Sequence, residues 1–230
     1  MINITSDMLD NKQINTLQQC KLFANFSETD IMQFLDSISY KRIAFSKNEI
    51  YALAGMPYRH VDIVLEGTMV CRMSSVGGKQ IEVSRLRAGH LIAPAFIFSA
   101  NNLMPVSVET VEPCLILRID KVDFVRAIDE NSRLCMNFIR TLSDINVFLT
   151  HKINVLSLMT VREKVGYLLI KRAKEQNSRV IQLYRSRQQI ADSFGIQKYS
   201  LQRVLADFEK EGAIEIDGRS IKILDSNKLK

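Results

Sequence analysis

The spacing of hydrophobic residues changes twice along this chain. Behind Ser27, with Asp30 three residues later, apolar residues recur at helical intervals as far as Ile38, which predicts a short helix with Ser27 as its N-cap. From Tyr40 to Asp120, short apolar runs are separated by turns such as SSVGGKQ and SANNLMP, which contain Gly, Pro or Asn. Roughly seven short strands without crossover helices predict an antiparallel sandwich or jelly-roll barrel.

After Asp120 the helical period takes over and continues without interruption to about Gln176. Within this region an apolar stripe repeats at spacings of three, four and seven, formed by Cys135, Phe138, Leu142, Ile145, Leu149 and Leu156. Such a stripe packs either on the barrel of its own chain or against a second copy in a parallel two-helix seam. Its length favours the dimer seam.

The segment from Arg185 to Gly212 contains two short helical patterns that are broken at Gly195. Each pattern has an apolar inner face, formed by Ile190, Ala191 and Phe194 in the first and by Leu201, Val204, Leu205 and Phe208 in the second. A small residue, Ala191, lies four positions before the glycine, where two steeply crossing helices come close. A short turn that needs positive φ suits Gly195. The spacing therefore predicts a helix-turn-helix.

The outer face of the second helix carries long donor side chains. Lys198, Tyr199, Gln202 and Arg203 centre roughly 140° from the inner stripe, at 100° per residue. In a helix-turn-helix this end of the second helix enters the major groove. Arg and Lys can contact guanine, Gln can pair with adenine, and Tyr can reach a phosphate or a thymine methyl. The alternative is a solvated helix face without a partner.

A two-stranded hairpin follows, because AIEIDGRSIKIL alternates on both sides of Asp217-Gly218. Helix, turn, helix and hairpin together predict a winged helix. Four residues are predicted to lie near the DNA backbone: Arg219 and Lys222 on the wing, and Ser186 and Arg187 at the start of the first helix. Ser200 is a further candidate DNA-binding residue.

Composition and charge agree with a DNA partner. The net charge is +6, and from Thr150 onwards 16 Lys and Arg stand against 9 Asp and Glu, or +7, while the preceding part counts 15 against 16, or −1. The four cysteines are scattered, which argues against disulfides and a four-thiolate metal site. A polar N-terminus and the lack of a long apolar run predict a cytoplasmic protein with no membrane partner.

From about Leu22 to Leu224 the chain resembles the Crp/Fnr superfamily of bacterial transcription regulators. VDIVLEGTMVCRM is similar to that family's strand–Glu-Gly–strand turn, RLRAGHLIAPAFIF to the segment before its ligand cassette, and SRQQIADSFGIQKYSLQRVL to its recognition segment. The family's Arg-Glu-x-x-x-Arg base readers fall on Lys198, Tyr199 and Arg203, where Tyr199 replaces an acceptor. The resemblance implies an α+β chain: a cyclic nucleotide-binding-like barrel over residues 1–120, a dimerisation helix and hinge over 121–156, and a winged helix over 157–230.

The resemblance also places an effector pocket, with Gly89, His90, Phe96, Phe98, Met104, Pro105 and Val106 as its candidate residues. Cyclic nucleotide-binding members carry Gly-Glu and Arg-Ser or Arg-Thr there, whereas this chain has Gly89-His90 and Pro105-Val106. Cyclic AMP is therefore not expected as a ligand, and the apolar cassette either holds an apolar or neutral ligand or is packed shut.

The residue types needed for other cofactors and for an enzymatic activity are few in this chain. An iron–sulfur cluster lacks its N-terminal cysteine group, and haem held by Cys71 or His90 stays an alternative. A jelly-roll metal enzyme needs several converging histidines, but the chain has three in all. The sequence thus predicts a homodimeric, non-enzymatic DNA-binding regulator without a metal, whose barrel responds to an unidentified small-molecule signal or has lost sensing. Its expected partners are a double-stranded operator, a second copy and, for an activator, RNA polymerase.

Overall fold

The computed structural model describes residues 2–4, 9–74 and 80–229, so most of the predicted turn SSVGGKQ lies outside the described residues. Contacts divide the chain into two units. The first consists of Met1–Met73 and Val83–Val147, and the second consists of Ser74–Glu82 and Phe148–Lys230, so that one boundary falls within a long helix. We call these the barrel unit and the C-terminal unit. The boundary within the helix is nine residues before the one that the sequence predicted after residue 156.

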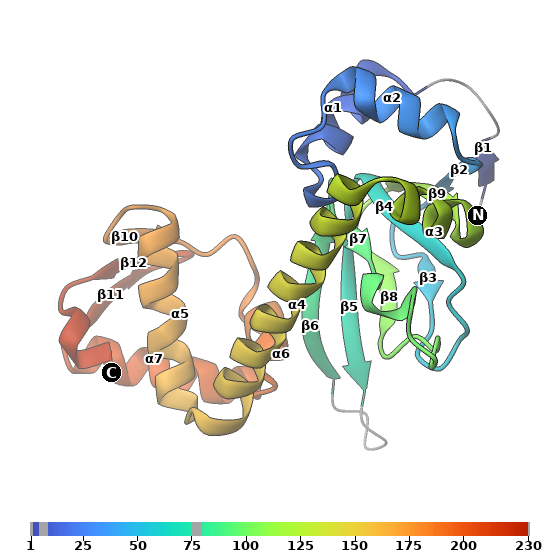
Figure 1. Cartoon of the computed structure of the whole chain (residues 1–230). Helices are drawn as coiled ribbons and strands as arrows, with labels where there is room; N and C mark the ends of the chain where they lie inside the picture. Colours follow the sequence, from blue (N-terminus) through green and yellow to red (C-terminus); the bar gives the residue numbers. More distant parts are fainter. Residues whose placement is uncertain (1, 5–8, 75–79, 230) are drawn as a thin grey trace. The chain divides into compact units, whose positions relative to one another are not determined.

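Two antiparallel sheets form the barrel, in agreement with the predicted class. The first sheet has the order β1-β2-β9-β4-β7, and the second has the order β3-β8-β5-β6 (Figure 1). The strands are β1 (Ile2–Ile4), β2 (Tyr40–Phe45), β3 (Ile50–Ala52), β4 (His60–Glu66), β5 (Thr68–Ser74), β6 (Gln80–Arg87), β7 (Leu91–Ile92), β8 (Ser107–Thr110) and β9 (Cys114–Asp120). A short 3-10 helix, η2 (Pro94–Phe96), follows β7.

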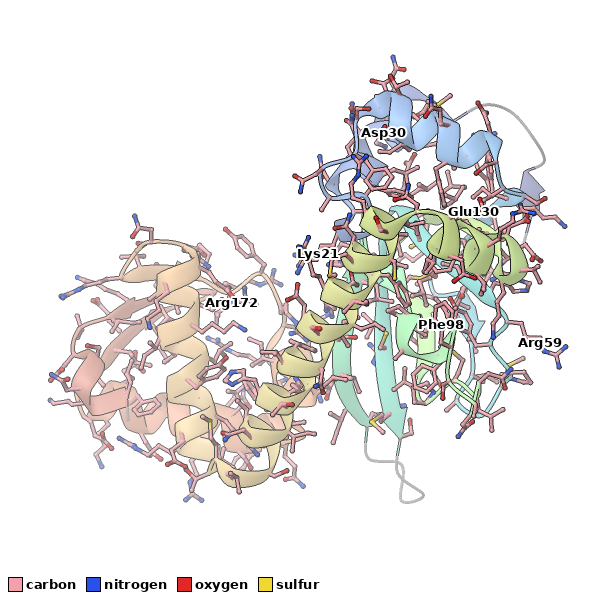
Figure 2. The ribbon with its side chains drawn as sticks, in the orientation of Figure 1. Lys21, Asp30, Arg59, Phe98, Glu130 and Arg172 are labelled. Atoms are coloured by element: carbon pink, nitrogen blue, oxygen red, sulfur yellow. The ribbon has the colours of Figure 1, made fainter. Side chains whose placement is uncertain are left out.

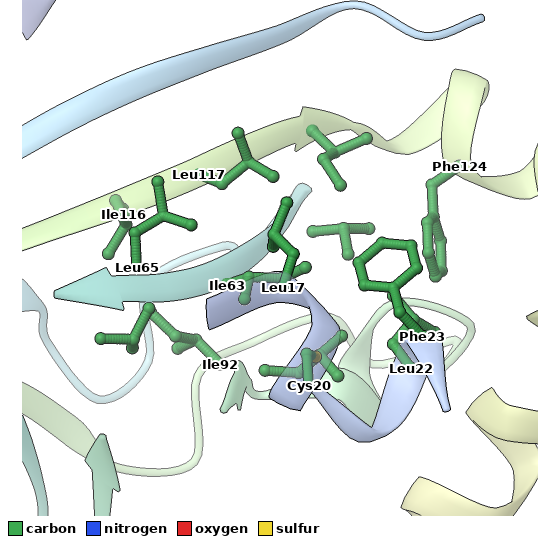
Figure 3. Packing of buried hydrophobic residues seen from close by; sticks show 14 of the residues in the cluster. Leu17, Cys20, Leu22, Phe23, Ile63, Leu65, Ile92, Ile116, Leu117 and Phe124 are labelled. Atoms are coloured by element: carbon green, nitrogen blue, oxygen red, sulfur yellow. The ribbon is translucent and has the colours of Figure 1, made fainter. Parts of the chain in front are cut away.

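Helices at the N-terminus cover one face of the first sheet, where the barrel core continues (Figure 3). These are α1 (Asn11–Gln19), η1 (Lys21–Phe23) and α2 (Glu28–Asp36). Leu17, Leu22 and Phe23 are fully buried in one cluster with Ile63 of β4 and Leu117 of β9. The predicted cap of α2 is confirmed, because Ser27 Oγ accepts a hydrogen bond from the Asp30 N–H at 3.1 Å.

The long helical region is interrupted, so the prediction of one unbroken helical segment was wrong. It contains α3 (Lys121–Glu130), α4 (Ser132–Leu158) and α5 (Val161–Glu175). Asn131 has extended φ and ψ of −127° and 98° between the first two. Thr160 caps α5 by accepting from the Glu163 N–H at 3.2 Å, while the Glu163 carboxylate accepts from the Thr160 N–H. This T-x-x-E capping box is a sequence signal for a helix start.

The C-terminal unit contains the predicted helix pair and hairpin. Its elements after α5 are β10 (Val180–Gln182), α6 (Arg187–Phe194), α7 (Lys198–Lys210), β11 (Ile214–Asp217), β12 (Ser220–Ile223) and η3 (Ser226–Leu229). The hairpin turns at Asp217-Gly218, as predicted, but β10 adds a third strand in the order β10-β12-β11. Three residues are too few to show an alternating pattern, which is why the sequence did not reveal β10. Among the described residues, none of the helices has the length and apolar character that crossing a membrane requires.

Candidate nucleic-acid interface

The turn between α6 and α7 has the geometry that the sequence predicted. Gly195 ends α6 with φ of 61°, in the left-handed region that favours glycine. Ala191 is fully buried, and its carbonyl accepts from the Ile196 N–H at 3.1 Å, which closes the turn. The inner faces of both helices join Ile181 and Ile221 of the small sheet in one core. That core fixes which face of α7 points outward.

The outward face of α7 is exposed in the C-terminal unit. Lys198, Gln202 and Arg203 are exposed, Tyr199 has an exposed fraction of 72%, and Ser200 is half-buried. The first turn of α7 contains no acidic residue. The positive end of the helix dipole therefore adds to the charge of Lys198, which favours a phosphate or a base acceptor nearby.

The wing and the start of α6 are joined by one side chain. Arg187 is half-buried and donates from Nη2 to the Gly218 carbonyl at 3.3 Å, and burial lowers the pKa of its guanidinium. Ser186 serves as the N-cap of α6 and accepts from the Gln189 N–H. Arg219 is exposed at the wing turn, whereas Lys222 lies on the stem, 3.6 Å from the Glu215 carboxylate. Of these two cations, Lys222 is therefore the one that pairs with a carboxylate of the wing itself.

The predicted seam on α4 is partly used by the barrel unit itself. Phe138 is 4% exposed, and its ring lies 5.5 Å from that of Phe98 and 5.6 Å from that of Phe124, so it is not free to contact a second copy. Cys135 and Leu142 are half-buried against the same core. In the single chain, Phe138 of the predicted seam is therefore part of the barrel core. Ile145 is half-buried and Leu149 is exposed.

The candidate effector residues are divided between the core and the surface. Gly89 lies in the turn between β6 and β7 with φ of 84°, and His90 Nδ1 accepts from the Arg87 N–H at 2.7 Å, while burial lowers the pKa of His90. Met104 is buried, whereas Phe98 is exposed by 51% next to α4 (Figure 2). Phe96 and Val106 are half-buried, and Pro105 is exposed.

A buried ion pair inside the barrel was not anticipated from the sequence. Asp62 of β4 is fully buried and lies directly opposite Arg118 of β9 in the strand register. Arg118 donates from Nε to Asp62 Oδ1 at 3.0 Å and from Nη2 to Oδ2 at 2.6 Å. The Tyr51 hydroxyl of β3, in the other sheet, donates to Oδ2 at 2.5 Å. The cluster therefore connects the two sheets through a single carboxylate.

All four cysteines lie in the barrel core or pack against it. Cys20, Cys71 and Cys114 are buried and Cys135 is half-buried. Burial raises the pKa of Cys20 and of Cys114 to about 11. Thiols with raised pKa are poor nucleophiles and poor metal ligands at neutral pH. Within the described ranges, no group of three His, Cys, Asp or Glu residues is arranged to hold a metal ion.

Comparisons with known proteins agree with this architecture. A cyclic nucleotide-binding domain model matches residues 42–131, and a Crp-like helix-turn-helix domain model matches residues 163–230. The nitrogen fixation regulation protein FixK of Azorhizobium caulinodans is 26% identical over 180 residues, which cover 74% of this chain and 70% of that protein.

Solved structures of low identity share the fold. A CooA mutant from Carboxydothermus hydrogenoformans has a TM-score of 0.70 at 18% identity and covers 96% of both chains. The c-di-GMP responsive regulator CLP of Xanthomonas campestris has a TM-score of 0.69 at 18% identity, over 86% of this chain and 99% of that one. With a barrel, a long helix and a helix-turn-helix in this order, the chain belongs to the Crp/Fnr family of DNA-binding transcription regulators.

Proposed function

We propose that this regulator binds a two-fold symmetric operator as a homodimer and reads bases with the exposed face of α7. The observation that carries the proposal is the cluster of Lys198, Tyr199, Gln202 and Arg203 on one exposed face, behind a turn fixed by Gly195. Arg203 suits a bidentate contact with guanine and Gln202 one with adenine. The two copies of α7 would then enter successive major grooves, about 34 Å apart.

Backbone contacts come from the residues around the recognition helix. Arg219 is exposed at the wing turn, and Ser186 and Arg187 lie at the start of α6. Charge in this part of the chain supports the assignment, because the net charge of +7 from Thr150 onwards contrasts with −1 before it. Phosphate neutralisation contributes affinity that falls with salt, whereas base contacts contribute sequence preference.

Arg203→Ala and Arg219→Ala should separate these two roles. Arg203→Ala should weaken operator binding by about 1–3 kcal/mol and relax the preference at one base pair in each half-site. Arg219→Ala should weaken operator and scrambled DNA alike and flatten the slope of log affinity against log salt by roughly two units in a dimer. Titrations of both variants on both duplexes at several salt concentrations measure these effects.

Arg219 is a better residue than Arg187 for testing contacts with the DNA backbone. Removing Arg187 also removes its hydrogen bond to Gly218, so the wing turn would lose a support as well as a charge. If Arg203→Ala weakened both duplexes equally and left the base preference intact, the exposed face of α7 would be an electrostatic anchor, and the proposed base-reading role would be wrong.

We further propose that the barrel does not take cyclic AMP. A cyclic phosphate buried in the barrel needs a guanidinium partner, and the Arg118 guanidinium is already held by Asp62 in a bidentate pair. Moving Arg118 to a phosphate would leave the fully buried Asp62 carboxylate without its counter-ion, which is a large cost. Pro105, at the position where the resemblance places the family's arginine, offers no charge.

Calorimetry with cyclic AMP should therefore give no heat of binding at physiological concentrations of the nucleotide. A matched titration with operator DNA shows that the same preparation is active. A dissociation constant in the micromolar range or tighter would contradict this expectation and would show that another side chain supplies the missing charge.

Haem is a second candidate for the barrel, with Cys71 or His90 as its ligand. The hydrogen bond from the Arg87 N–H to His90 Nδ1 leaves Nε2 as the ring nitrogen for an iron. Cys71 is buried on β5. An absorption spectrum of protein purified from its own host decides between a haem-containing barrel and one without it, through the presence or absence of a Soret band.

A further inference from the structure

Three rows of side chains at heptad spacing run along α4, and two of them can combine into a seam. The leucine row is Leu142, Leu149 and Leu156. The inner row is Phe138, Ile145 and Lys152, and the outer row is Ile139, Asn146 and Ile153. The inner and outer rows are offset from each other by one residue, and each lies three or four residues from the leucines. Either row can therefore combine with the leucine row in a two-helix seam.

Contacts within the chain occupy the inner row. Phe138 is buried in the barrel core. Lys152, which is half-buried, donates from Nζ to the Ser193 carbonyl at the end of α6 (2.7 Å), and both residues belong to the C-terminal unit. Ile145, between them, is half-buried.

The outer row is exposed along its whole length. Ile139 is exposed by 47% and Ile153 by 64%, and Asn146 between them is exposed as well. An exposed row with isoleucine at both ends, next to a row of leucines, is unusual for a helix face that stays in water. In a homodimer the seam would therefore consist of the outer row and the leucine row.

The residue types in the outer row and the leucine row match those of a parallel two-stranded coiled coil. Isoleucine at the first core position of a heptad and leucine at the second favour two parallel strands, and a single asparagine at the first position selects register and oligomeric state. The outer row has isoleucine, asparagine and isoleucine in this order, and all three residues of the other row are leucine. The pattern is self-complementary, so a second copy of the same helix fits it.

We propose that Asn146 pairs with its own symmetry mate and fixes the parallel, in-register arrangement of the two α4 helices. In that arrangement the two side-chain amides meet and can exchange a hydrogen bond. In an antiparallel or shifted pairing each amide would face leucine or isoleucine and would be buried without a partner, which is unfavourable. This inference rests on the proposed homodimer and adds the residue that sets its geometry.

The register of the two α4 helices matters because each chain also carries a recognition helix, α7. A shift of one heptad moves one helix along the other by roughly 10 Å, at 1.5 Å per residue. Two recognition helices that must stand one DNA turn apart do not tolerate such a displacement. A polar residue in the middle of an apolar seam weakens the dimer but makes the productive register the preferred one.

Asn146→Ile tests the proposal, with Asn154→Ile as the matched control. Asn154 is exposed on the same helix outside all three rows, so both variants make the same chemical change. Asn146→Ile should lower the dimer dissociation constant about tenfold or more, because two buried amides are replaced by apolar side chains. Asn154→Ile should leave it unchanged. Sedimentation velocity over a dilution series gives the constants.

Disulfide cross-linking reports the register directly. In a Cys135→Ser background, one tagged chain carries Leu142→Cys and the other carries Leu149→Cys. With Asn146 present, oxidation should join only cysteines at the same position, whereas with Asn146→Ile mixed cross-links between 142 and 149 should appear. A tighter dimer without mixed cross-links, or an unchanged dissociation constant, would overturn the role of Asn146. A monomeric wild-type protein over the whole dilution series would instead overturn the proposed homodimer.

Discussion

Ile153→Glu should yield a folded monomer whose affinity for operator DNA is lower by about 100-fold or more, because two linked half-site contacts become one. The Ile153 side chain is 64% exposed in the single chain, so the substitution removes little packing from the fold. In a parallel dimer it would place two carboxylates against each other in an apolar seam, where neither has a counter-ion. Light scattering gives the mass, and titration of operator DNA gives the affinity.

Asn154→Glu is the control, since it adds the same charge one residue further along α4 on an exposed position outside the seam. It should remain a dimer with nearly unchanged affinity. Far-ultraviolet circular dichroism of both variants establishes that α4 is intact. A dimeric mass for Ile153→Glu would show that the outer row does not contact a second copy.

The α4 stripe shows what periodicity can and cannot predict. Heptad spacing predicts the leucine row, because Leu142, Leu149 and Leu156 belong to the seam with either neighbouring row. It does not decide between Phe138 and Ile139, since both are apolar and one residue apart. That choice depends on the rings of Phe98 and Phe124, which come from distant parts of the sequence and occupy the Phe138 side.

The helix-turn-helix was predictable because its determinants are local. Ala191, Gly195 and the apolar positions around them lie within about two dozen residues, and each is constrained by backbone geometry. The helix breaks at Asn131 and Thr160 also depend on local sequence. The capping box at Thr160 marks the start of α5, but the helical spacing of apolar residues continues across it and hid the break. The three-residue strand β10 carried no such signal.

The barrel interior was harder to predict, because its polar cluster joins residues that are far apart in sequence. Asp62 and Arg118 each interrupt an apolar strand, VDIVLEG and CLILRI. One acid and one base at interior positions of two apolar strands are a usable signal, since buried charges are paired. Only the register of β4 and β9, however, places these two residues opposite each other.

Arg118→Ala should therefore destabilise the protein by about 3–5 kcal/mol, the usual cost of removing one partner from a buried ion pair. Asp62 has no exposed side-chain surface, and after the substitution the Tyr51 hydroxyl would still donate to its carboxylate but would not balance its charge. Urea unfolding of the barrel transition gives the free energy. Arg126→Ala is the control, because the Arg126 side chain is 54% exposed in its pair with Asp123 and should contribute no more than about 1 kcal/mol.

The double variant Asp62→Leu/Arg118→Met distinguishes a costly unpaired charge from a pair that stabilises the fold. Replacing both charges with apolar side chains of similar size should restore most of the lost stability, because neither desolvation nor an unpaired carboxylate remains. The Tyr51 hydroxyl then loses its hydrogen-bond acceptor. The free energy of unfolding of the double variant should therefore stay about 1–3 kcal/mol below that of the wild type. If the double variant were as unstable as Arg118→Ala alone, the ion pair between β4 and β9 would itself stabilise the barrel. If Arg118→Ala cost less than about 1 kcal/mol, water or another cation would reach Asp62. Asp62 would then not need Arg118 as its counter-ion, and Arg118 could bind the phosphate of cyclic AMP.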